Sequence, residues 1–380
     1  MSGNYKINVS FLTNAKAPYR KLQFEELAKI SDCKFTIYYT NPHPLDRNWS
    51  VDPINGVGEF ALRGLRVSKK NGYINFGLRK IVKESDLLLI GGTEQPTYHL
   101  VARLCKRYGK KYVLIFDGVS PKKIDVVRRN YVKYKLKSKI INDASAIFGN
   151  GTVAIEYFTK AFGYPKEKIF NQYLTVNVER IMNFLSQKEE LRKIYREKYA
   201  IPMDHEVIIY SGRLLKRKNV SLIVRALKSL DKAFLLILGD GEEKENILRL
   251  AESLRVPCKI TGFIEDQDEL FKSYCAGDLL VLSSYNEAWG LVVNEAMAAG
   301  LPVIVSNECG CYLDLVKDGE NGFVLTDLEN PDMLRSLVLK ALAKKTEFSK
   351  KSLEMISDWT FDNSRRSFEN LLAEVLADSL

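Results

Sequence analysis

The chain has 380 residues, more than one ordinary hydrophobic core accommodates, so two domains are expected. It has no run of about 20 apolar residues and begins with a strand-like stretch, which excludes a membrane-spanning helix, argues against a signal peptide and predicts a cytoplasmic protein. The net charge of +10 is uneven: residues 1–200 contain 36 Lys and Arg against 18 Asp and Glu, and residues 201–380 contain 21 against 29, so the first half is expected to meet anionic lipid, a phosphate-bearing substrate or nucleic acid.

Strands and helices alternate along the first half, which predicts an α/β domain. Strands are expected at 6–12, 34–40, 86–91, 111–116 and 145–149, and helices at 21–30, 95–108, 122–141, 152–163 and 188–199. Residues 42–75 show no clear pattern. No nucleic-acid-reading module is recognisable, so nucleic acid is not an expected partner.

The expected helix at 122–141 carries eight basic residues and one acid, with Val, Tyr, Leu and Ile between them. This pattern is typical of a helix at an anionic membrane surface, and a peripheral position on the inner face of the cell membrane is one interpretation. The other is a solvated helix that packs its apolar side on the sheet.

A charged helix followed by Ile201-Pro202 marks the domain junction. We therefore expect an N-terminal domain at 1–185, a linker helix at 186–200, a C-terminal domain at 201–362 and a last helix at 363–380 that can return to the first domain. The second α/β series has strand-like segments EVIIYSG, KAFLLILG, CKITGF, DLLVL, PVIVS and NGFVLT.

Cations follow the first of these strands. Gly212 allows a close turn, and Arg213 and Lys218 come shortly after it, before a helix expected from about Asn219. Cations at the end of a strand beside a helix N-terminus can clamp phosphate, although a solvated basic turn is the simpler alternative.

Two further strand ends have weaker signals. The turn after FLLILGDG lacks the third glycine of a dinucleotide fingerprint, so it is interpreted as architecture. Phe263 can border a nucleobase. Asp266 and Asp268 form a D-x-D pattern that could hold a metal, but at a helix start helix capping is favoured.

Glu287 and Glu295 are separated by seven residues in the segment SSYNEAWGLVVNEAMAAG, between two strands. The turn before the helix lies at the carboxyl edge of the sheet, where open α/β sheets bind ligands. Both carboxylates can therefore address one ligand, and the amides of Gly290, Leu291 and Val292 would form an anion site between them. Alternatively, Glu287 is a surface residue and Glu295 is held by a neighbouring Arg or amide.

Together these motifs resemble retaining glycosyltransferases of family 4, whose GT-B fold has two facing Rossmann-like domains with parallel sheets and a nucleotide-sugar cleft between them. The resemblance covers most of residues 207–326. It rests on G-R-L…K, the G-F turn, E-A-W-G-L-V-V-N-E, A-A-G-L-P-V-I and D-G-E-N-G-F-V. A looser match, SFLTNAKAPYRKLQFEEL, resembles a P-Y-R-type bacterial branch.

The resemblance implies that Arg213 and Lys218 bind the diphosphate, Glu295 the ribose and Glu287 the donor sugar, with Phe263 at the base. It implies a metal-independent, retaining transfer of a hexose-type sugar, with UDP-sugar as the expected donor and no cofactor. The acceptor would be a saccharide or a lipid-linked saccharide in surface-polysaccharide or lipopolysaccharide biosynthesis.

The first half departs from the family's usual pattern. A loop containing Lys16, Tyr19 and Arg20 replaces a Gly-Gly turn, and we assign these residues to the acceptor side, with Lys16 and Arg20 as possible substitutes for amide contacts to phosphate. Asp117 stands where many relatives place a His near the reacting sugar, so it could orient a donor or acceptor hydroxyl; a helix or turn cap is the alternative. These departures leave open a non-catalytic sugar-nucleotide-binding subunit or a GT-B-fold epimerase.

The six cysteines lie mostly in apolar surroundings, as reduced core thiols do. Cys309 and Cys311 form a Cys-Gly-Cys pattern, but there is no second pair and only three histidines. We therefore expect no metal site.

Overall fold

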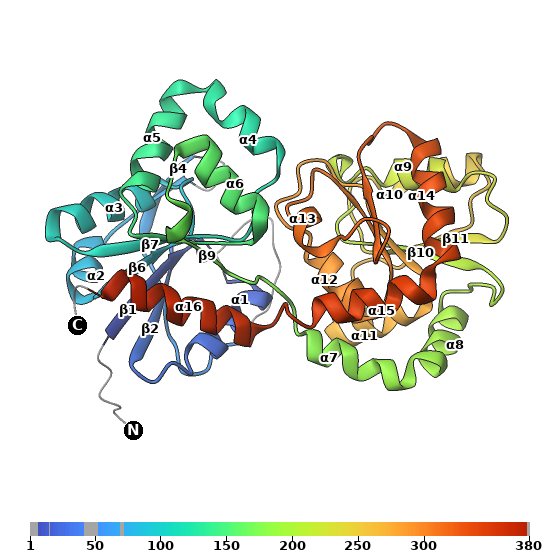
Figure 1. Ribbon diagram of the computed structural model, residues 1–380, viewed down its shortest axis with the longest axis horizontal. Coiled ribbons are helices and arrows are strands. Elements are labelled where there is room, and N and C mark those ends of the chain that lie inside the picture. The colour runs from blue at the N-terminus through green and yellow to red at the C-terminus, as the bar shows by residue number, and fades with distance from the viewer. Residues whose placement is uncertain (1–6, 15, 42–51, 69–71, 378–380) are drawn as a thin grey trace. The chain divides into compact units, whose positions relative to one another are not determined.

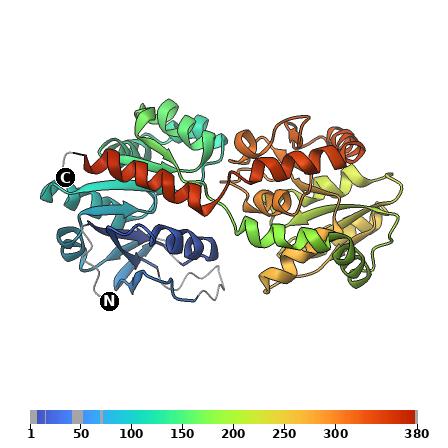
Figure 2. The same cartoon turned by 60° about the horizontal axis from the view of Figure 1, so that its bottom comes forward.

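The computed structural model describes residues 7–14, 16–41, 52–68 and 72–377. The chain forms two compact units. Unit 1 comprises Met1–Val119, Lys123–Leu174 and Phe361–Leu380, and unit 2 comprises Ser120–Lys122 and Thr175–Thr360. Each unit is a parallel sheet with helices packed around it (Figures 1 and 2).

The sheet of unit 1 has the strand order β3-β2-β1-β6-β7-β8-β9, and all pairs are parallel. Its strands are β1 (Ile7–Thr13), β2 (Cys33–Tyr39), β3 (Gly58–Ala61), β6 (Leu87–Ile90), β7 (Lys111–Phe116), β8 (Ala146–Gly149) and β9 (Ile169–Asn171). A separate antiparallel pair joins β4 (Gly64–Ser68) to β5 (Gly72–Asn75). The helices are α1 (Pro18–Leu27), α2 (Leu78–Glu84), α3 (Pro96–Tyr108), α4 (Lys122–Val126), α5 (Tyr131–Asn142), α6 (Gly151–Phe162) and α16 (Phe361–Leu376).

Unit 2 has the strand order β12-β11-β10-β13-β14-β15, again parallel throughout. The strands are β10 (Glu206–Ser211), β11 (Ala233–Leu238), β12 (Cys258–Ile260), β13 (Leu279–Leu282), β14 (Val303–Ser306) and β15 (Gly322–Leu325). The helices are α7 (Val178–Met182), α8 (Lys188–Lys198), α9 (Val220–Leu227), α10 (Lys244–Ser253), α11 (Gln267–Ser273), α12 (Leu291–Ala298), α13 (Tyr312–Leu315), α14 (Pro331–Ala343) and α15 (Lys345–Ile356).

Both orders are those of a doubly wound Rossmann sheet, in which the chain runs outward in one direction and then returns to the other side of the first strand. Central strands such as β6 and β13 are apolar along their whole length and fully buried, because helices cover both faces of a parallel sheet. The α/β class and the parallel sheets predicted from the sequence are confirmed.

The last helix, α16, belongs to unit 1 (Figure 1). Its Phe368 is fully buried and packs against Phe35 of β2 and Phe148 of β8, with ring centroids 5.9 and 5.4 Å apart. Burial of this aromatic cluster accounts for the return of the chain to unit 1 after it has completed unit 2.

Two expectations from the sequence need correction. The expected single helix at 122–141 is broken: α4 ends at Val126, a 3₁₀ turn follows, and α5 begins after Asn130. The cause is local, because the Asn130 side chain accepts a hydrogen bond from the Lys133 amide and so caps a new helix. Residues 58–75, for which no pattern was found, contain β3, β4 and β5, whereas residues 42–51 and 69–71 lie outside the described residues.

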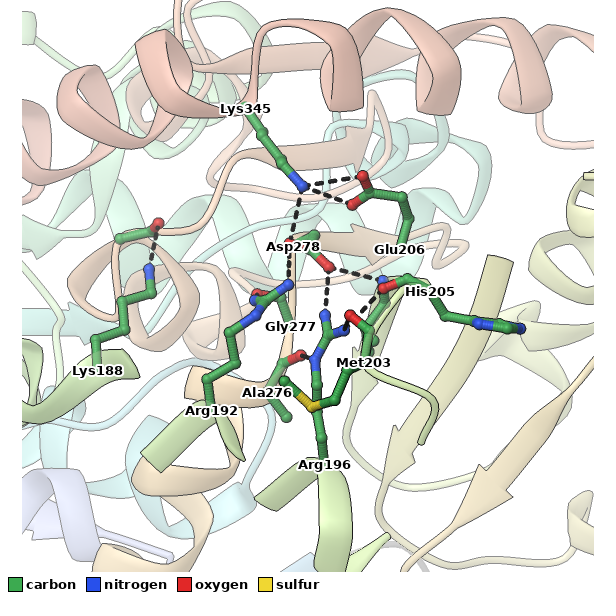
Figure 3. Close-up of polar contacts among 12 residues, drawn as sticks. Lys188, Arg192, Arg196, Met203, His205, Glu206, Ala276, Gly277, Asp278 and Lys345 are labelled. Carbon is green, nitrogen blue, oxygen red and sulfur yellow. Dashed lines mark hydrogen bonds and ion pairs between the residues drawn. The ribbon is translucent and has the colours of Figure 1, made fainter. Parts of the chain in front are cut away.

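The second correction concerns the unit boundary, which lies at Leu174/Thr175 and not near residue 186. The expected linker helix, α8, is an integral part of unit 2 (Figure 3). Its Arg192 and Arg196 each form an ion pair of 2.8 Å with Asp278, at the start of β13. Arg196 is completely buried and also donates to the backbone carbonyls of Ala276, Met203 and His205, so α8 is bound to the sheet by a buried charge network.

None of the helices within the described residues combines the length and the apolarity that crossing a bilayer requires.

Candidate functional site

The candidate site in unit 2 lies where the sheet changes direction. Strands β10 and β13 are neighbours, with Ile208 opposite Leu279, but the chain leaves their carboxyl ends toward opposite sides of the sheet. Such switch points are where open α/β sheets bind ligands. Arg213 and Lys218 follow β10, and Glu287 follows β13, so the topology brings these three residues to one sheet edge.

The turn after β10 requires glycine. Gly212 has a φ of +130°, and a Cβ at Gly239, after β11, would lie only 2.1 Å from the Gly212 carbonyl oxygen. This close backbone approach exposes Arg213 directly after the strand. Its guanidinium has no hydrogen bond or ion pair within the described part of the chain, so it is available to a ligand.

Lys218 and Glu287 form an ion pair, and each side chain is 14% exposed. Arg217 also reaches the same carboxylate oxygen of Glu287, with 3.2 Å between Nη1 and Oε2, and is half exposed. The carboxylate therefore lies between two cations. The pairing of Arg217 with Glu287 was not predicted from the sequence, because a KRK run alone does not show which of its cations reaches the carboxylate.

The loop that carries Glu287 is held by its backbone. The Glu287 amide donates to the Glu308 carbonyl at 3.1 Å, and the Gly310 amide donates to the Glu287 carbonyl at 3.0 Å. The Glu308 carboxylate also accepts a hydrogen bond of 3.0 Å from the Asn286 amide. Glu308 thus fixes the loop from the end of β14, a role for which its sequence context has no signal.

Helix α12 begins directly after this loop. Gly290, its N-cap, has a φ of +98°, and a Cβ there would lie 2.8 Å from Leu282 Cδ2. Leu291 and Val292, at the first two helical positions, are only half-buried. The first amides of a helix have no partner within the helix, so the N-terminus of α12 offers donors and a partial positive charge beside Glu287.

Glu295 lies on α12 and is half-buried. Its Oε2 accepts a hydrogen bond of 2.7 Å from the hydroxyl of Tyr274, which is completely buried. Burial raises the pKa of Glu295 to about 7, although the Tyr274 hydrogen bond opposes this shift. The partner is therefore a tyrosine and not the Arg or backbone amide considered from the sequence.

The remaining predicted residues of unit 2 have simpler environments. Phe263 is 72% exposed in the turn after the edge strand β12, two strands from β10. Asp266 caps α11 by accepting hydrogen bonds from the amides of Asp268 and Glu269, which confirms the predicted capping role. Asp268 instead pairs with Arg180 at 2.7 Å.

In unit 1, the structure brings Tyr19, Arg20 and Asp117 together. The Tyr19 hydroxyl donates to Asp117 Oδ2 at 2.8 Å, and Arg20 pairs with Oδ1 of the same carboxylate. Arg20 is buried and also donates to Gln23 at 2.5 Å and Gln172 at 2.7 Å. Three hydrogen bonds from its two Nη atoms suit Arg20 to orienting Asp117, and a ligand phosphate would have to compete with these partners.

Lys16 is also engaged, since its ammonium lies 2.9 Å from the Glu59 carboxylate. Burial would raise the pKa of Glu59, but hydrogen bonds from Tyr39 and Lys16 outweigh this effect and lower it. A ligand phosphate would have to compete with Glu59 for Lys16.

All six cysteines are free thiols, five of them buried. Within the described ranges, no group of three or more His, Cys, Asp or Glu side chains is arranged to hold a metal ion.

Residues 192–357 match the family model described as glycosyl transferases group 1. Over 130 residues the chain is 35% identical to the lipopolysaccharide core biosynthesis glycosyltransferase LpsE of Rhizobium meliloti. This alignment covers 34% of this chain and 38% of LpsE. Over 185 residues the chain is 31% identical to the lipopolysaccharide glucosyltransferase WaaG of Escherichia coli. This alignment covers 48% of this chain and 49% of WaaG. Each match spans less than half of the relative's own length.

Similarity to solved structures extends over nearly the whole chain. HepE of Anabaena, solved in complex with UDP, has a TM-score of 0.71 at 15% identity, covering 98% of this chain and 100% of HepE. A glycosyltransferase from Rickettsia africae has a TM-score of 0.76 at 16% identity, with the same coverage. Likeness at such low identity concerns the fold, and it confirms the expected GT-B architecture.

Proposed function

We propose that this chain, whose fold is GT-B and whose residues 192–357 match a glycosyltransferase family model, is a glycosyltransferase similar to family 4. It would transfer a hexose-type sugar from a nucleotide-diphosphate sugar to a saccharide or lipid-linked saccharide. The observation that carries the proposal is the Lys218–Glu287 ion pair at the switch point of unit 2, beside the N-terminus of α12. A UDP-sugar is the expected donor, since HepE was solved with UDP and with UDP-glucose.

The charges of the site suit such a donor. Arg213, Lys218 and the first amides of α12 would bind the diphosphate, because all three present positive charge or hydrogen-bond donors at one sheet edge. Lys218 would then exchange part of its contact with Glu287 for phosphate, which frees the carboxylate to accept hydrogen bonds from the hydroxyls of the sugar. Glu295 would accept hydrogen bonds from the ribose, and Phe263 would cover the base.

The proposed chemistry is retaining and needs no protein nucleophile. The acceptor oxygen forms a bond to the anomeric carbon on the face from which the diphosphate leaves, and the bond from that carbon to the phosphate oxygen breaks. The acceptor's proton passes to a phosphate oxygen, so the products are the glycoside and the nucleoside diphosphate. Arg213, Lys218 and the α12 amides would stabilise the charge that develops on the leaving group, so we propose that the reaction is metal-independent.

Unit 1 is proposed to bind the acceptor. Asp117 remains 39% exposed although Tyr19 and Arg20 hold its carboxylate, so it can still orient an acceptor or donor hydroxyl. We propose a role in lipopolysaccharide or surface-polysaccharide biosynthesis, which the names of LpsE and WaaG support.

Peripheral contact with an anionic membrane is part of the proposal, and α5 supports it. Tyr131, Val132 and Leu136 are 68, 67 and 48% exposed, and they alternate with the exposed Lys133 and Lys135. An apolar side that is not packed on the sheet, flanked by lysines, fits the interface of an anionic bilayer better than it fits a solvated helix. In this arrangement the protein would lie on the inner face of the cell membrane.

The proposal is tested by screening nucleotide sugars for thermal stabilisation and then measuring nucleotide release with and without a saccharide acceptor. A donor at 100-fold above its dissociation constant should add about 2.7 kcal/mol of stability. Release that requires the acceptor would distinguish a transferase from a non-catalytic binding subunit or an epimerase. Turnover that persists in excess EDTA would support the absence of a metal requirement.

Two substitutions test the assignment of Glu287 and Lys218 to the donor site. Lys218→Ala should lower kcat/KM by about 100-fold or more, the usual effect of removing one group that stabilises developing charge. Glu287→Gln should cause a loss of about the same size, because the sugar hydroxyls that Glu287 holds fix the position of the reacting carbon. Glu252→Gln, on the exposed side of α10, is the matched control and should keep wild-type activity. Near-wild-type activity in either site variant would overturn the donor-site assignment.

A further inference from the structure

A buried hydrogen-bond chain lies behind Glu295. Tyr274 follows α11 in the 3₁₀ helix Tyr274–Ala276 and is completely buried. Its hydroxyl donates to Glu295 Oε2 at 2.7 Å, and the Ser211 hydroxyl hydrogen-bonds to the phenol oxygen. Ser211 is the last residue of β10, so the chain runs from the strand that precedes Arg213 to the carboxylate on α12.

The environment of Glu295 on α12 is dominated by Tyr274. Within the described residues, the Tyr274 hydroxyl is the one side-chain group that hydrogen-bonds to Glu295, and it occupies Oε2, so Oε1 is left for a ligand. Tyr210, which precedes Ser211 on β10, is also buried and lies close to Tyr274. Three cations near α12 have their own partners: Arg180 with Asp268, Lys345 with Glu206 and Asp278, and Lys188 with the carbonyls of Ala299 and Gly300. Glu179 of α7 and Glu347 and Lys350 of α15 are exposed.

We propose that Tyr274 is the positioning residue for Glu295: its hydroxyl holds Oε2 and so orients the carboxylate for Oε1 to accept hydrogen bonds from the ribose hydroxyls of the donor. The inference rests on the proposed donor site. A phenol hydroxyl is suited to this role because it donates one hydrogen bond in a fixed direction and brings no charge into a buried site. An Arg in its place would neutralise the carboxylate and compete with the ribose.

The pH dependence of ribose recognition follows from the opposite effects of burial and of the Tyr274 hydrogen bond on the pKa of Glu295. Burial raises the pKa of Glu295 to about 7, and the hydrogen bond from Tyr274 lowers it. Removing the Tyr274 hydroxyl removes the lowering contribution, so the carboxyl group of Glu295 would stay protonated to a higher pH. Ribose recognition should then weaken at pH 7 and return as the pH rises.

The experiment compares UDP with 2′,3′-dideoxy-UDP, which lacks the ribose hydroxyls. The dissociation constants of both are measured by calorimetry from pH 5.5 to 9 for the wild type and Tyr274→Phe. The readout is the dissociation constant of dideoxy-UDP divided by that of UDP, because titration of the phosphates affects both ligands alike. We expect Tyr274→Phe to lower the ratio by about tenfold at pH 7, the usual effect of losing a hydrogen bond to a charged group, and to recover part of it at pH 9.

Tyr199→Phe is the matched control. Tyr199 is buried in the same unit, and its hydroxyl bonds to Ser273 at 2.7 Å and not to Glu295. Both variants should leave the affinity for dideoxy-UDP unchanged, whereas general damage to the fold would weaken both ligands. Glu295→Gln, which cannot ionise, should show the low ratio at every pH.

Two results would overturn the inference in distinguishable ways. If the wild type discriminates between the ligands and Tyr274→Phe discriminates equally at all pH values, Tyr274 does not position Glu295, and the donor site stands. If the wild type binds both ligands alike, the assignment of Glu295 to the ribose falls, and the inference falls with it.

Discussion

The strongest stability prediction concerns Asp278→Asn, at the centre of the charge network in Figure 3. The Asp278 side chain is 4% exposed and accepts hydrogen bonds from Arg192 and Arg196, both at 2.8 Å, from Lys345 at 3.2 Å and from the Val207 amide at 2.9 Å. Asparagine preserves the shape but removes the negative charge with which Arg196, itself fully buried, forms its ion pair among the described residues. Removing one partner of a buried ion pair costs about 3–5 kcal/mol, and we expect a loss in that range.

The pH dependence provides a second readout. Burial alone would raise the pKa of Asp278, but Arg192 and the Val207 amide outweigh burial and hold it below the usual range. A carboxylate with a lowered folded-state pKa contributes stability above its unfolded pKa of about 3.9 and loses it as the pH falls through the folded pKa. The difference between wild type and variant should therefore be constant from pH 5 to 9 and shrink in acid.

The assay is urea unfolding followed by tryptophan fluorescence. The chain has three tryptophans, and replacing Trp49 with Phe leaves Trp289 and Trp359, which contact each other in unit 2 at a centroid distance of 4.9 Å. Asp204→Asn is the control, because Asp204 pairs with Lys232 at the surface and solvent screens that pair. An unfolding free energy for Asp278→Asn no lower than that of the control would refute the reasoning.

Two other predictions concern α12 and α5. Gly290→Ala should destabilise unit 2 by about 2 kcal/mol, since the φ of +98° and the contact with Leu282 both disfavour a Cβ; an unchanged melting temperature would contradict this. Replacing Lys133 and Lys139, both exposed on α5, with Gln should weaken binding to anionic vesicles, more at 20 mM than at 300 mM salt, because screening already removes the attraction at high salt. Neutralising the two lysines of the 3₁₀ turn Lys166–Lys168 should have little effect, and equal losses from both pairs would exclude a specific role of α5.

Features with local causes could be predicted from the sequence. The six strands of unit 2, the capping role of Asp266 and the placement of Arg213 and Glu287 after neighbouring strands depend on apolar runs, turn residues and crossover order. Each of these signals lies within a few residues of the feature that it predicts. The break at Asn130 was also local, but a single asparagine inside an otherwise continuous helical pattern is a weak signal.

The partners of buried polar groups were decided by the tertiary structure. Arg20 was assigned to the acceptor side from its loop, but its partner Asp117, which lies 97 residues away in the chain, could not be identified from the sequence. Tyr274, 21 residues before Glu295, had no role in the sequence interpretation, and α8 was taken for a linker although Asp278, 82 residues after Arg196, binds it to the sheet. The physical reason is the same in each case: a polar side chain must find a partner when it is buried, and only the packing of distant segments determines which partner is within reach.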